Sequence, residues 1–383
     1  MRLSCSIVGE AEAEAVRKVI CQDGYLGMGN ATRRFEEELA AYLGVEDWQV
    51  ISVNSGTAAL QLAVDAVKGQ SLKHYDCHKP PRILVPSLTF VASFQAIMAA
   101  GCEPVACDVL LETGTIDLED AAKKMDERVI ALMHVDYASN PWHLDKVYDF
   151  GLKQGIRIID DAAHAFGCRH HGRKIGSFGD LVCFSFDGIK NITCGEGGCL
   201  IAFDRESAAL AADARLLGVQ GDSAKRFAGT RSWDPDVTRI GWRFHLSNIM
   251  AAIGSVQLTR LESEFIPARR KLYNLYAELL QDTPHLKLLK TDPLDFIVPH
   301  ILPVRVLDDF KAKVEAEMKK ADIPLGLHYK PNHLLSLFGK GSSSLPNVEK
   351  LYLELVTLPL HPGLSDRDVR FICKNLKKVL ESH

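Results

Sequence analysis

The stretch LVCFSFDGIKNITCGEGG runs from Leu181 to Gly198 and predicts a buried strand followed by a glycine-rich turn. Lys190 lies in this turn, a few residues after the apolar run. A lysine amine that is partly desolvated at such a junction can act as a nucleophile and form a Schiff base with a carbonyl group. Most lysines are solvated surface charges, so Lys190 needs partners elsewhere in the chain before it indicates chemistry.

A second turn lies upstream, after the β-branched run VISV at Val50–Val53. Residues 54–57 (NSGT) lead from this predicted strand into the apolar helix AALQLAVDAV. The free N–H groups and the hydroxyl at such a helix start can hold a phosphate. The alternative is a plain helix cap, in which Ser55 or Thr57 satisfies the first turn.

A pair of carboxylates, Asp160 and Asp161, ends the predicted strand IRIIDD. In an open α/β sheet, ligands bind at the carboxyl ends of the strands. A carboxylate there can keep a pyridine nitrogen protonated, which makes a pyridoxal phosphate ring an electron sink. Either residue could instead cap the helix that begins DAAHAF, and capping suits Asp160 better than Asp161. We expect no metal site, because no second carboxylate or histidine cluster recurs at ligand spacing.

Taken together, the phosphate turn, the strand-end carboxylate and the lysine, in this order, favour a pyridoxal phosphate enzyme. The chain resembles the fold-type I pyridoxal phosphate aminotransferases of the DegT/DnrJ/EryC1/StrS family, which act on nucleotide-linked keto sugars. The resemblance extends from GYLGMGNATRRFEEELAAYLG at Gly24 to LPLHPGLSDRDV at Leu358. Its most specific segments are VNSGTAALQLA, PSLTFVAS, IIDDAAHAFG, GSFGDLVCFSF, IKNITCGEGG and LSNIMAAIGSVQL.

The resemblance implies a role for each residue at a matching position. Lys190 would form the Schiff base and shuttle a proton between substrate carbon and cofactor, while Asp161 would pair with the pyridinium nitrogen. Phe90 would stack on the ring face, although its apolar neighbours alone are more typical of a core residue. His164 would lie near the cofactor's phenolic oxygen, with a hydrogen bond inside the core as the alternative. The residues implied for the phosphate are Gly56, Thr57, Ala58 and Ser185.

One position departs from the family's pattern. Many members carry the run G-Y-N-Y-R, whose Asn reaches across a dimer interface to the partner's phosphate, whereas this chain has Arg243 at that position. A guanidinium can bind a phosphate at least as well as an amide can. The alternative for Arg243 is a surface or interface salt bridge. The family and the neighbouring Trp242 and Phe244 also indicate a homodimer with active sites at the interface.

Two further segments are candidates for the mouth of the site. Tyr25 and Leu26 lie between two glycines, and Tyr25 could also be an exposed turn aromatic. His328 and Tyr329 belong to the run HYKPNH, which the family places near the mouth. Substrate contact and a loop hydrogen bond are both open for this run. Its two histidines do not predict a metal, because no acidic or cysteine ligand accompanies them.

The composition agrees with a cytoplasmic enzyme. With 383 residues, 47% of them hydrophobic, the chain can bury one large core and one smaller core. The net charge of −4, without a basic cluster, argues against a nucleic-acid partner. The ten cysteines show no CxxC pair, which favours free thiols in a reducing compartment. The N-terminus is too polar for a signal peptide, and no apolar run approaches membrane-spanning length, so we expect no membrane association.

Strand-like and helix-like segments alternate from about residue 50 to residue 205. This rhythm predicts an α/β fold of the fold-type I aminotransferase kind, with a mainly parallel sheet flanked by helices. The expected strands are VISV, RILV, PVAC, VIALMHV, IRIID, LVCFSF and CLIAF. We expect a large cofactor-binding domain over residues 1–245 and a smaller C-terminal α+β domain over residues 246–383. The polar stretch from Gln220 to Arg239 is expected to form an excursion over the surface or the partner subunit.

The predicted activity is that of a pyridoxal phosphate-dependent aminotransferase. A few relatives with His at the lysine position catalyse dehydration, so Lys190 favours amine transfer. By family expectation, L-glutamate converts the cofactor to pyridoxamine phosphate, which then aminates the C3 or C4 keto group of a nucleotide-linked deoxy sugar. Two alternatives stay open: an aminotransferase for a cyclitol ketone such as an inosose, and a non-catalytic regulatory protein of the same fold.

Overall fold

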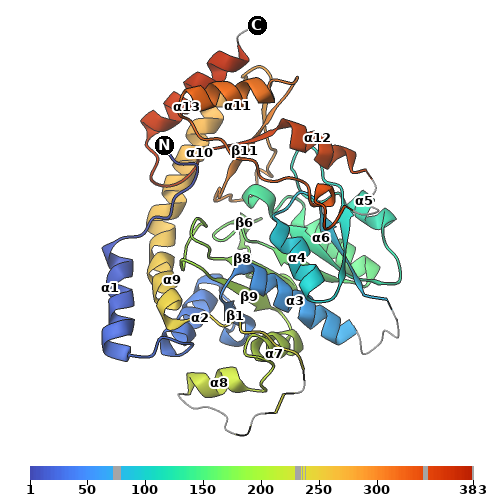
Figure 1. Ribbon diagram of the computed structural model, residues 1–383, viewed down its shortest axis with the longest axis vertical. Coiled ribbons are helices and arrows are strands. Elements are labelled where there is room, and N and C mark those ends of the chain that lie inside the picture. The colour runs from blue at the N-terminus through green and yellow to red at the C-terminus, as the bar shows by residue number, and fades with distance from the viewer. Residues whose placement is uncertain (72–78, 229–233, 235, 238, 340–343, 382–383) are drawn as a thin grey trace.

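The structure is a computed structural model that describes residues 1–71, 79–228, 234, 236–237, 239–339 and 344–381. A seven-stranded sheet forms its centre, and a three-stranded sheet lies in the C-terminal part of the chain (Figure 1). Two-residue strands β6 (Arg169–His170) and β7 (Arg173–Lys174) form a separate hairpin. Among the described residues, no helix is both long and apolar enough to cross a bilayer.

The central sheet has the strand order β1-β9-β8-β5-β4-β2-β3. Strand β9 is antiparallel to both of its neighbours, and the other pairs are parallel. All seven strands expected from the sequence are present, so the predicted α/β fold is confirmed. Their bounds are β1 (Val50–Val53), β2 (Arg82–Pro86), β3 (Glu103–Cys107), β4 (Val129–Val135), β5 (Arg157–Asp161), β8 (Leu181–Ser185) and β9 (Gly198–Ala202).

Helices cover both faces of this sheet, and alternate side chains of each strand join different cores. Ile83 of β2 joins the core beneath α3 (Gly56–Ser71), α4 (Val91–Ala99) and α7 (Arg205–Ala214). Its neighbour Leu84 joins the core on the opposite face, with α2 (Asn30–Leu43) and α6 (Leu144–Gln154). In β5, Ile158 belongs to the α2 and α6 side and Ile159 to the α3 and α4 side. Strand alternation then directs Asp161 toward α3 and α4 and Asp160 away from them.

The strand directions bring the sequence-predicted residues to one edge of the sheet. Because β9 is antiparallel to both β1 and β8, these two strands run in the same direction as β5. The carboxyl ends of β1, β5 and β8 therefore meet at one edge. Asp161 and Ser185 end two of these strands, and α3 begins three residues after β1.

The C-terminal part has its own core. The strands β10 (Leu286–Leu288), β11 (Leu302–Val306) and β12 (Leu355–Leu358) pack with α10 (Ile266–Leu280), α11 (Lys311–Lys320) and α13 (Asp366–Leu380). Helix α9 (Asn248–Arg260) lies instead beside α1 (Glu10–Lys18) and α2 (Figure 1). A domain boundary between residues 245 and 246 stays a prediction, since α9 packs against the N-terminal helices. Remaining helices are α5 (Leu118–Lys123), α8 (Asp222–Phe227) and α12 (Pro346–Glu354).

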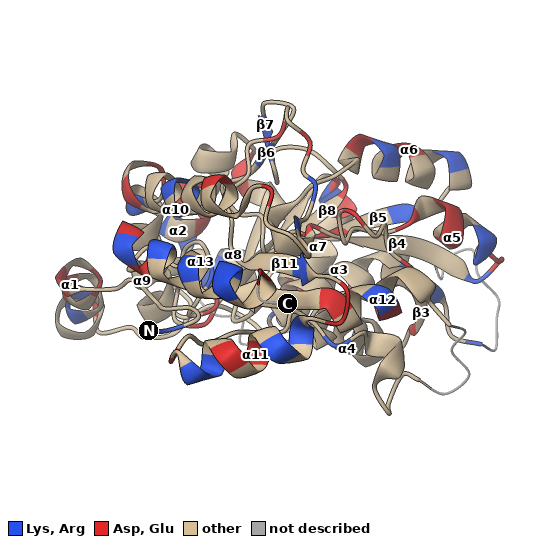
Figure 2. Ribbon diagram, turned by 90° about the horizontal axis from the view of Figure 1, so that it is seen from above, with Lys and Arg blue, Asp and Glu red and all other residues tan. Residues whose placement is uncertain are grey.

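Charged side chains of both signs alternate along the exposed helices. Figure 2 shows blue and red segments next to each other on α6 and on α11. On α6, Asp145 and Asp149 alternate with Lys146 and Lys153. Mixed signs of this kind cancel at a distance, so neither helix produces a strong field of one sign.

Candidate active site

Lys190 lies in the turn between β8 and β9, where its backbone N–H donates to the Asp187 carbonyl at 3.1 Å. The residue is partly buried, and its side chain lines a cavity of about 330 Å³ at the carboxyl edge of the sheet. Burial lowers the pKa of the Lys190 amine to about 8, against the opposing charges of Asp161 and Asp187. The amine is therefore a better nucleophile at neutral pH than a solvated lysine.

Two histidines stand next to this amine. The Nζ of Lys190 lies 3.5 Å from the Nε2 of His300, and the ring of His300 lies 4.6 Å from that of His164. The Nε2 of His164 is in turn 3.2 Å from the hydroxyl of Tyr329. Burial, with the charge of Lys190, holds the pKa of both imidazoles well below the usual value, so both are neutral. His300 was not predicted from the sequence.

Asp161 faces the cavity from the end of β5. Its Oδ2 accepts a hydrogen bond from the Ser93 hydroxyl at 2.8 Å, and its Oδ1 accepts one from the Ala163 N–H at 3.3 Å. Burial raises the pKa of this carboxyl, whereas these hydrogen bonds and the charge of Lys190 favour its ionised form. Asp161 can therefore receive a cationic N–H donor in the cavity.

Asp160 points to the opposite face, where it meets His134 and Asp136. Burial raises the pKa of Asp136 to about 8 and that of Asp160 well above its usual value. Burial also lowers the pKa of His134, which favours its neutral imidazole. This placement agrees with the sequence argument that Asp161, and not Asp160, faces the ligand. The carboxylate oxygens of Asp160 accept no hydrogen bond from the described residues, so Asp160 does not cap a helix.

The first turn of α3 forms another wall of the cavity. Ser55 caps this helix, because its Oγ accepts a hydrogen bond from the Ala58 N–H at 3.1 Å. The N–H groups of Gly56 and Thr57 have no partner within the helix, so they remain for an anion. A Cβ at Gly56 would lie 2.7 Å from the Cβ of Ser185, which shows how closely the helix start approaches the end of β8.

Phe90 and the segment around His328 form the mouth of the cavity. Phe90 is 55% exposed, so the alternative of a core residue is wrong. Its ring lies 5.5 Å from that of Tyr329, at the N-terminus of α4. The Nδ1 of His328 lies 2.9 Å from the Thr357 hydroxyl, and burial lowers its pKa to about 4. His328 is thus a neutral side chain that is both hydrogen-bonded and part of the cavity wall.

The other sequence-predicted residues lie away from the cavity lining within the described part of this single chain. Tyr25 is 42% exposed and Leu26 is 48% exposed. Arg243 is exposed as well. Next to it, Trp242 donates from its Nε1 to Asp65 at 2.9 Å and stacks on Phe244 at 5.8 Å. These residues can contribute to the site only if a second copy brings them to it.

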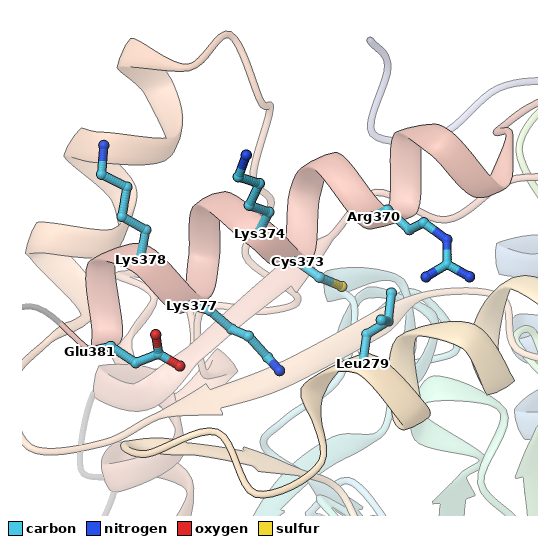
Figure 3. A pocket seen from close by; sticks show the side chains of 7 residues that line it. All are labelled: Leu279, Arg370, Cys373, Lys374, Lys377, Lys378 and Glu381. Carbon is cyan, nitrogen blue, oxygen red and sulfur yellow. The ribbon is translucent and has the colours of Figure 1, made fainter.

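A larger surface hollow lies on the C-terminal part, between α13 and α10 (Figure 3). In Figure 3, Cys373 and Lys377 point toward Leu279, whereas Lys374 and Lys378 point away from it. Its lining shares no residue with the Lys190 cavity among the described residues. Its described lining includes Cys373, lysines and Glu381 but no start of a helix that could hold a phosphate.

Comparisons with known proteins identify this arrangement. A profile of the DegT/DnrJ/EryC1/StrS aminotransferase family matches residues 6–377. The chain belongs to this family. It is 34% identical over 385 residues to a dTDP-4-dehydro-2,3,6-trideoxy-D-glucose 4-aminotransferase of Saccharopolyspora spinosa, with 98% of this chain and 96% of that protein covered. It is 29% identical over 382 residues to a UDP-4-amino-4,6-dideoxy-N-acetyl-beta-L-altrosamine transaminase of Campylobacter jejuni, with 98% and 96% covered.

Solved structures agree with this assignment. The aminotransferase TlmJ of Streptoalloteichus hindustanus superposes with a TM-score of 0.89 at 30% identity, covering 100% of this chain and 99% of that one. A Streptococcus pneumoniae protein named as a sugar aminotransferase, in its PLP form, gives a TM-score of 0.88 at 25% identity over 100% and 98% of the chains. The same protein is also known in a PMP form. This member of the DegT/DnrJ/EryC1/StrS family is thus an aminotransferase, and its cofactor is pyridoxal phosphate.

The cavity fits this cofactor on structural grounds. Three features line one cavity: the desolvated amine of Lys190, the buried carboxylate of Asp161 and the start of α3. They suit, in turn, the aldehyde, the ring nitrogen and the phosphate of the cofactor. Because Gly56 has no side chain, its backbone can approach Ser185 closely, and a larger residue at this position would collide with Ser185 at the end of β8. The exposed ring of Phe90 is free to cover an aromatic ligand.

Proposed function

We propose that this family member moves an amino group from L-glutamate to the C3 or C4 keto group of a nucleotide-linked deoxy sugar. The observation that supports it most is the cavity that brings Lys190 and Asp161 to the first turn of α3. Support for the acceptor comes from the two relatives, whose names refer to dTDP- and UDP-linked sugars.

Pyridoxal phosphate, when bound, supplies an aldehyde for an amine and a ring that withdraws electrons from the substrate carbon. Lys190 would be the nucleophile and the proton carrier, since its lowered pKa leaves a useful fraction of free amine near neutral pH. Asp161 would hold a protonated ring nitrogen through its carboxylate. Gly56 and Thr57 would bind the phosphate through their N–H groups and the Thr57 hydroxyl, with Ser185 opposite.

The neutral histidines His164 and His300 would hydrogen-bond the groups that take part in proton transfer without adding a positive charge beside the Lys190 amine. His300 is placed to accept a hydrogen bond from Lys190, which would orient the amine. His164 and Tyr329 share a hydrogen bond, so they would present one fixed polar edge to the cofactor's ring substituents. Phe90 would cover the ring face and limit the access of water.

The proposal includes a homodimer in which a second copy completes the mouth. Ile240 is 80% exposed and Val237 is 54% exposed, close in sequence to the exposed Arg243. Apolar exposure of this extent is typical of an interface. Arg243 would then reach the phosphate of the neighbouring site, and Tyr25 and Leu26 would contact the sugar nucleotide. The nine described cysteines are all free, which supports the expected cytoplasmic location.

The test follows both halves of the reaction. We expect L-glutamate to bleach the visible band of the holoenzyme, and Lys190→Ala to show no such change. With ¹⁵N-glutamate as donor, label should enter a dTDP- or UDP-linked keto sugar, and NMR of the product identifies the aminated carbon. Label in an inosose instead would refute the nucleotide-sugar acceptor. A band that does not respond to L-glutamate would refute L-glutamate as the donor. A band that bleaches while no nucleotide-linked keto sugar takes up label would refute this class of acceptor.

A further inference from the structure

A cluster of polar side chains lies at the far end of the β6–β7 hairpin, apart from the Lys190 cavity. Asp145 projects from the first turn of α6, His170 ends β6, and His171 follows it in the turn. One ligand atom from each of the three lies within 4.8 Å of the others. Imidazole nitrogen and carboxylate oxygen are preferred ligands of zinc. The sequence did not predict this cluster, because 25 residues separate Asp145 from His170 and only the fold brings them together.

The separations between these atoms match a tetrahedral cation site. The Oδ2 of Asp145 lies 3.2 Å from the Nε2 of His170 and 3.4 Å from the Nδ1 of His171. Zinc binds such ligands at about 2.0–2.1 Å, so two ligands of a tetrahedral site are about 3.3–3.4 Å apart. The rings of His170 and His171 are stacked, with centroids 4.0 Å apart and 22° between their planes, so the exposed ring of His171 must turn before both nitrogens can face one cation.

The nitrogen of His170 that points into this cluster has no hydrogen-bond partner. His170 is 2% exposed, and its Nε2 is buried without a partner although an Asp145 oxygen is near. The two atoms are close but are not aligned as donor and acceptor. This nitrogen therefore remains available to a further ligand.

Each histidine also has a carboxylate on its other nitrogen. The Nδ1 of His170 lies 2.8 Å from the Oδ1 of Asp295, and the Nε2 of His171 lies 3.3 Å from the Oδ2 of Asp292. Histidines that ligate metals commonly donate their second N–H to a carboxylate, which fixes the tautomer and orients the ring. Here that arrangement occurs on both rings, and the side chain of Asp295 is fully buried.

The charge balance of the group favours a cation. Asp145, Asp292 and Asp295 bring three carboxylates into a small volume, and the side chain of Asp295 is shielded from water. A divalent cation would offset two of these charges.

We propose that Asp145, His170 and His171 bind a divalent cation of the zinc class, with Asp292 and Asp295 orienting the two imidazoles. Three protein ligands leave the fourth position to water, on the side where Asp145 and His171 are exposed. The cation would join α6, the hairpin and the segment around Asp295. That segment leads within five residues to His300 beside Lys190, so the site braces the outer end of the segment that supplies this histidine.

The test is titration of the holoenzyme with zinc chloride in a calorimeter, under a reducing agent that does not bind metals. We expect one equivalent per chain to bind, and we expect His171→Ala and Asp145→Asn to abolish this event. Both residues lie at the surface, so the variants should fold. The matched control is His285→Ala, which removes a histidine that is paired with Asp308 at 2.7 Å but has no second histidine beside it. It should bind zinc as the wild type does.

A second variant distinguishes the residues that orient the imidazoles from those that bind the cation. Asp295→Asn should keep the stoichiometry and weaken zinc binding by about 10- to 100-fold, as loss of a carboxylate behind a ligating histidine does. Zinc should raise the melting temperature of the wild type and of His285→Ala, and leave that of His171→Ala unchanged. Equal zinc affinity in His171→Ala and wild type, or no stoichiometric binding to the wild type, would show that the cluster is only a set of ion pairs.

Discussion

The ionisation of Lys190 is the property on which the chemistry depends most directly, and it can be measured without any substrate. Burial brings the pKa of its amine from 10.5 to about 8. At pH 7 a group with a pKa of 8 is unprotonated in about one molecule in ten, against about one in 3,000 for a pKa of 10.5. The folded chain thus increases the free amine about 300-fold at neutral pH.

We expect the larger fraction of free Lys190 amine to increase the rate at which this residue is covalently labelled. Cofactor-free enzyme is treated with trace acetic anhydride between pH 6 and pH 10, and the peptide that carries Lys190 is quantified by mass spectrometry against a free lysine standard. Its labelling should rise about tenfold per pH unit up to about pH 8 and then level off. Labelling that rises to pH 10 in parallel with the standard would refute the desolvated amine. Asp161→Asn should shift the plateau to lower pH, because the Asp161 charge raises the pKa of Lys190.

Three further predictions follow from the same geometry. Because folding lowers the pKa of Lys190, the unfolded chain binds more protons than the folded chain between pH 8 and 10.5. Lys190→Met should therefore stabilise the cofactor-free protein by up to about 3 kcal/mol at pH 7 in urea unfolding, and this gain should fade as the pH rises from 8 to 10.5. Asp161→Asn should lower kcat/KM on the order of 100-fold, whereas Asp160→Asn should leave most activity, in steady-state assays of the two variants side by side. Gly56→Ala should weaken pyridoxal phosphate binding in fluorescence titrations, because the added Cβ would lie 2.7 Å from the Cβ of Ser185. Unchanged affinity would show that the start of α3 does not approach Ser185 this closely.

The fold was accessible from the sequence because local patterns determine it. Runs such as Val129–Val135 are apolar except for His134 and end in turn residues, as strands buried on both faces do. The strand-end rule predicted that Asp161 lies at the ligand-binding edge of the sheet, whereas the place of Ser185 followed from the resemblance to the family. What periodicity did not reveal is the reversed direction of β9 between β1 and β8. A short connection of twelve residues leads from β8 to β9, which is compatible with an antiparallel pair, yet no pattern in the strand itself records its direction.

His300 shows why part of the site could not be predicted. It precedes β11 and meets Lys190 from 110 residues away in the chain. Nothing in its neighbours, Pro299 and Ile301, separates it from other histidines of the sequence. Arg269 from α10 donates to the carbonyls of Pro299 and His300 at 3.2 and 3.3 Å, so packing between the two parts of the chain sets its position. Information of that kind lies in tertiary contacts and not in local spacing.

Asp160 and Asp161 show how environment divides identical residues between two tasks. Both are buried at the end of one strand, and only the alternation of side chains sends them to different faces. Asp160 meets Asp136 and a neutral histidine, so burial and mutual repulsion favour its protonated form. Burial raises the pKa of Asp161 as well, but the hydrogen bonds from Ser93 and Ala163 and the charge of the Lys190 amine oppose this rise and favour the ionised form. Because only an ionised carboxylate can hold a ring nitrogen in its cationic form, we predict that the reaction depends on Asp161 and that Asp160 does not replace it.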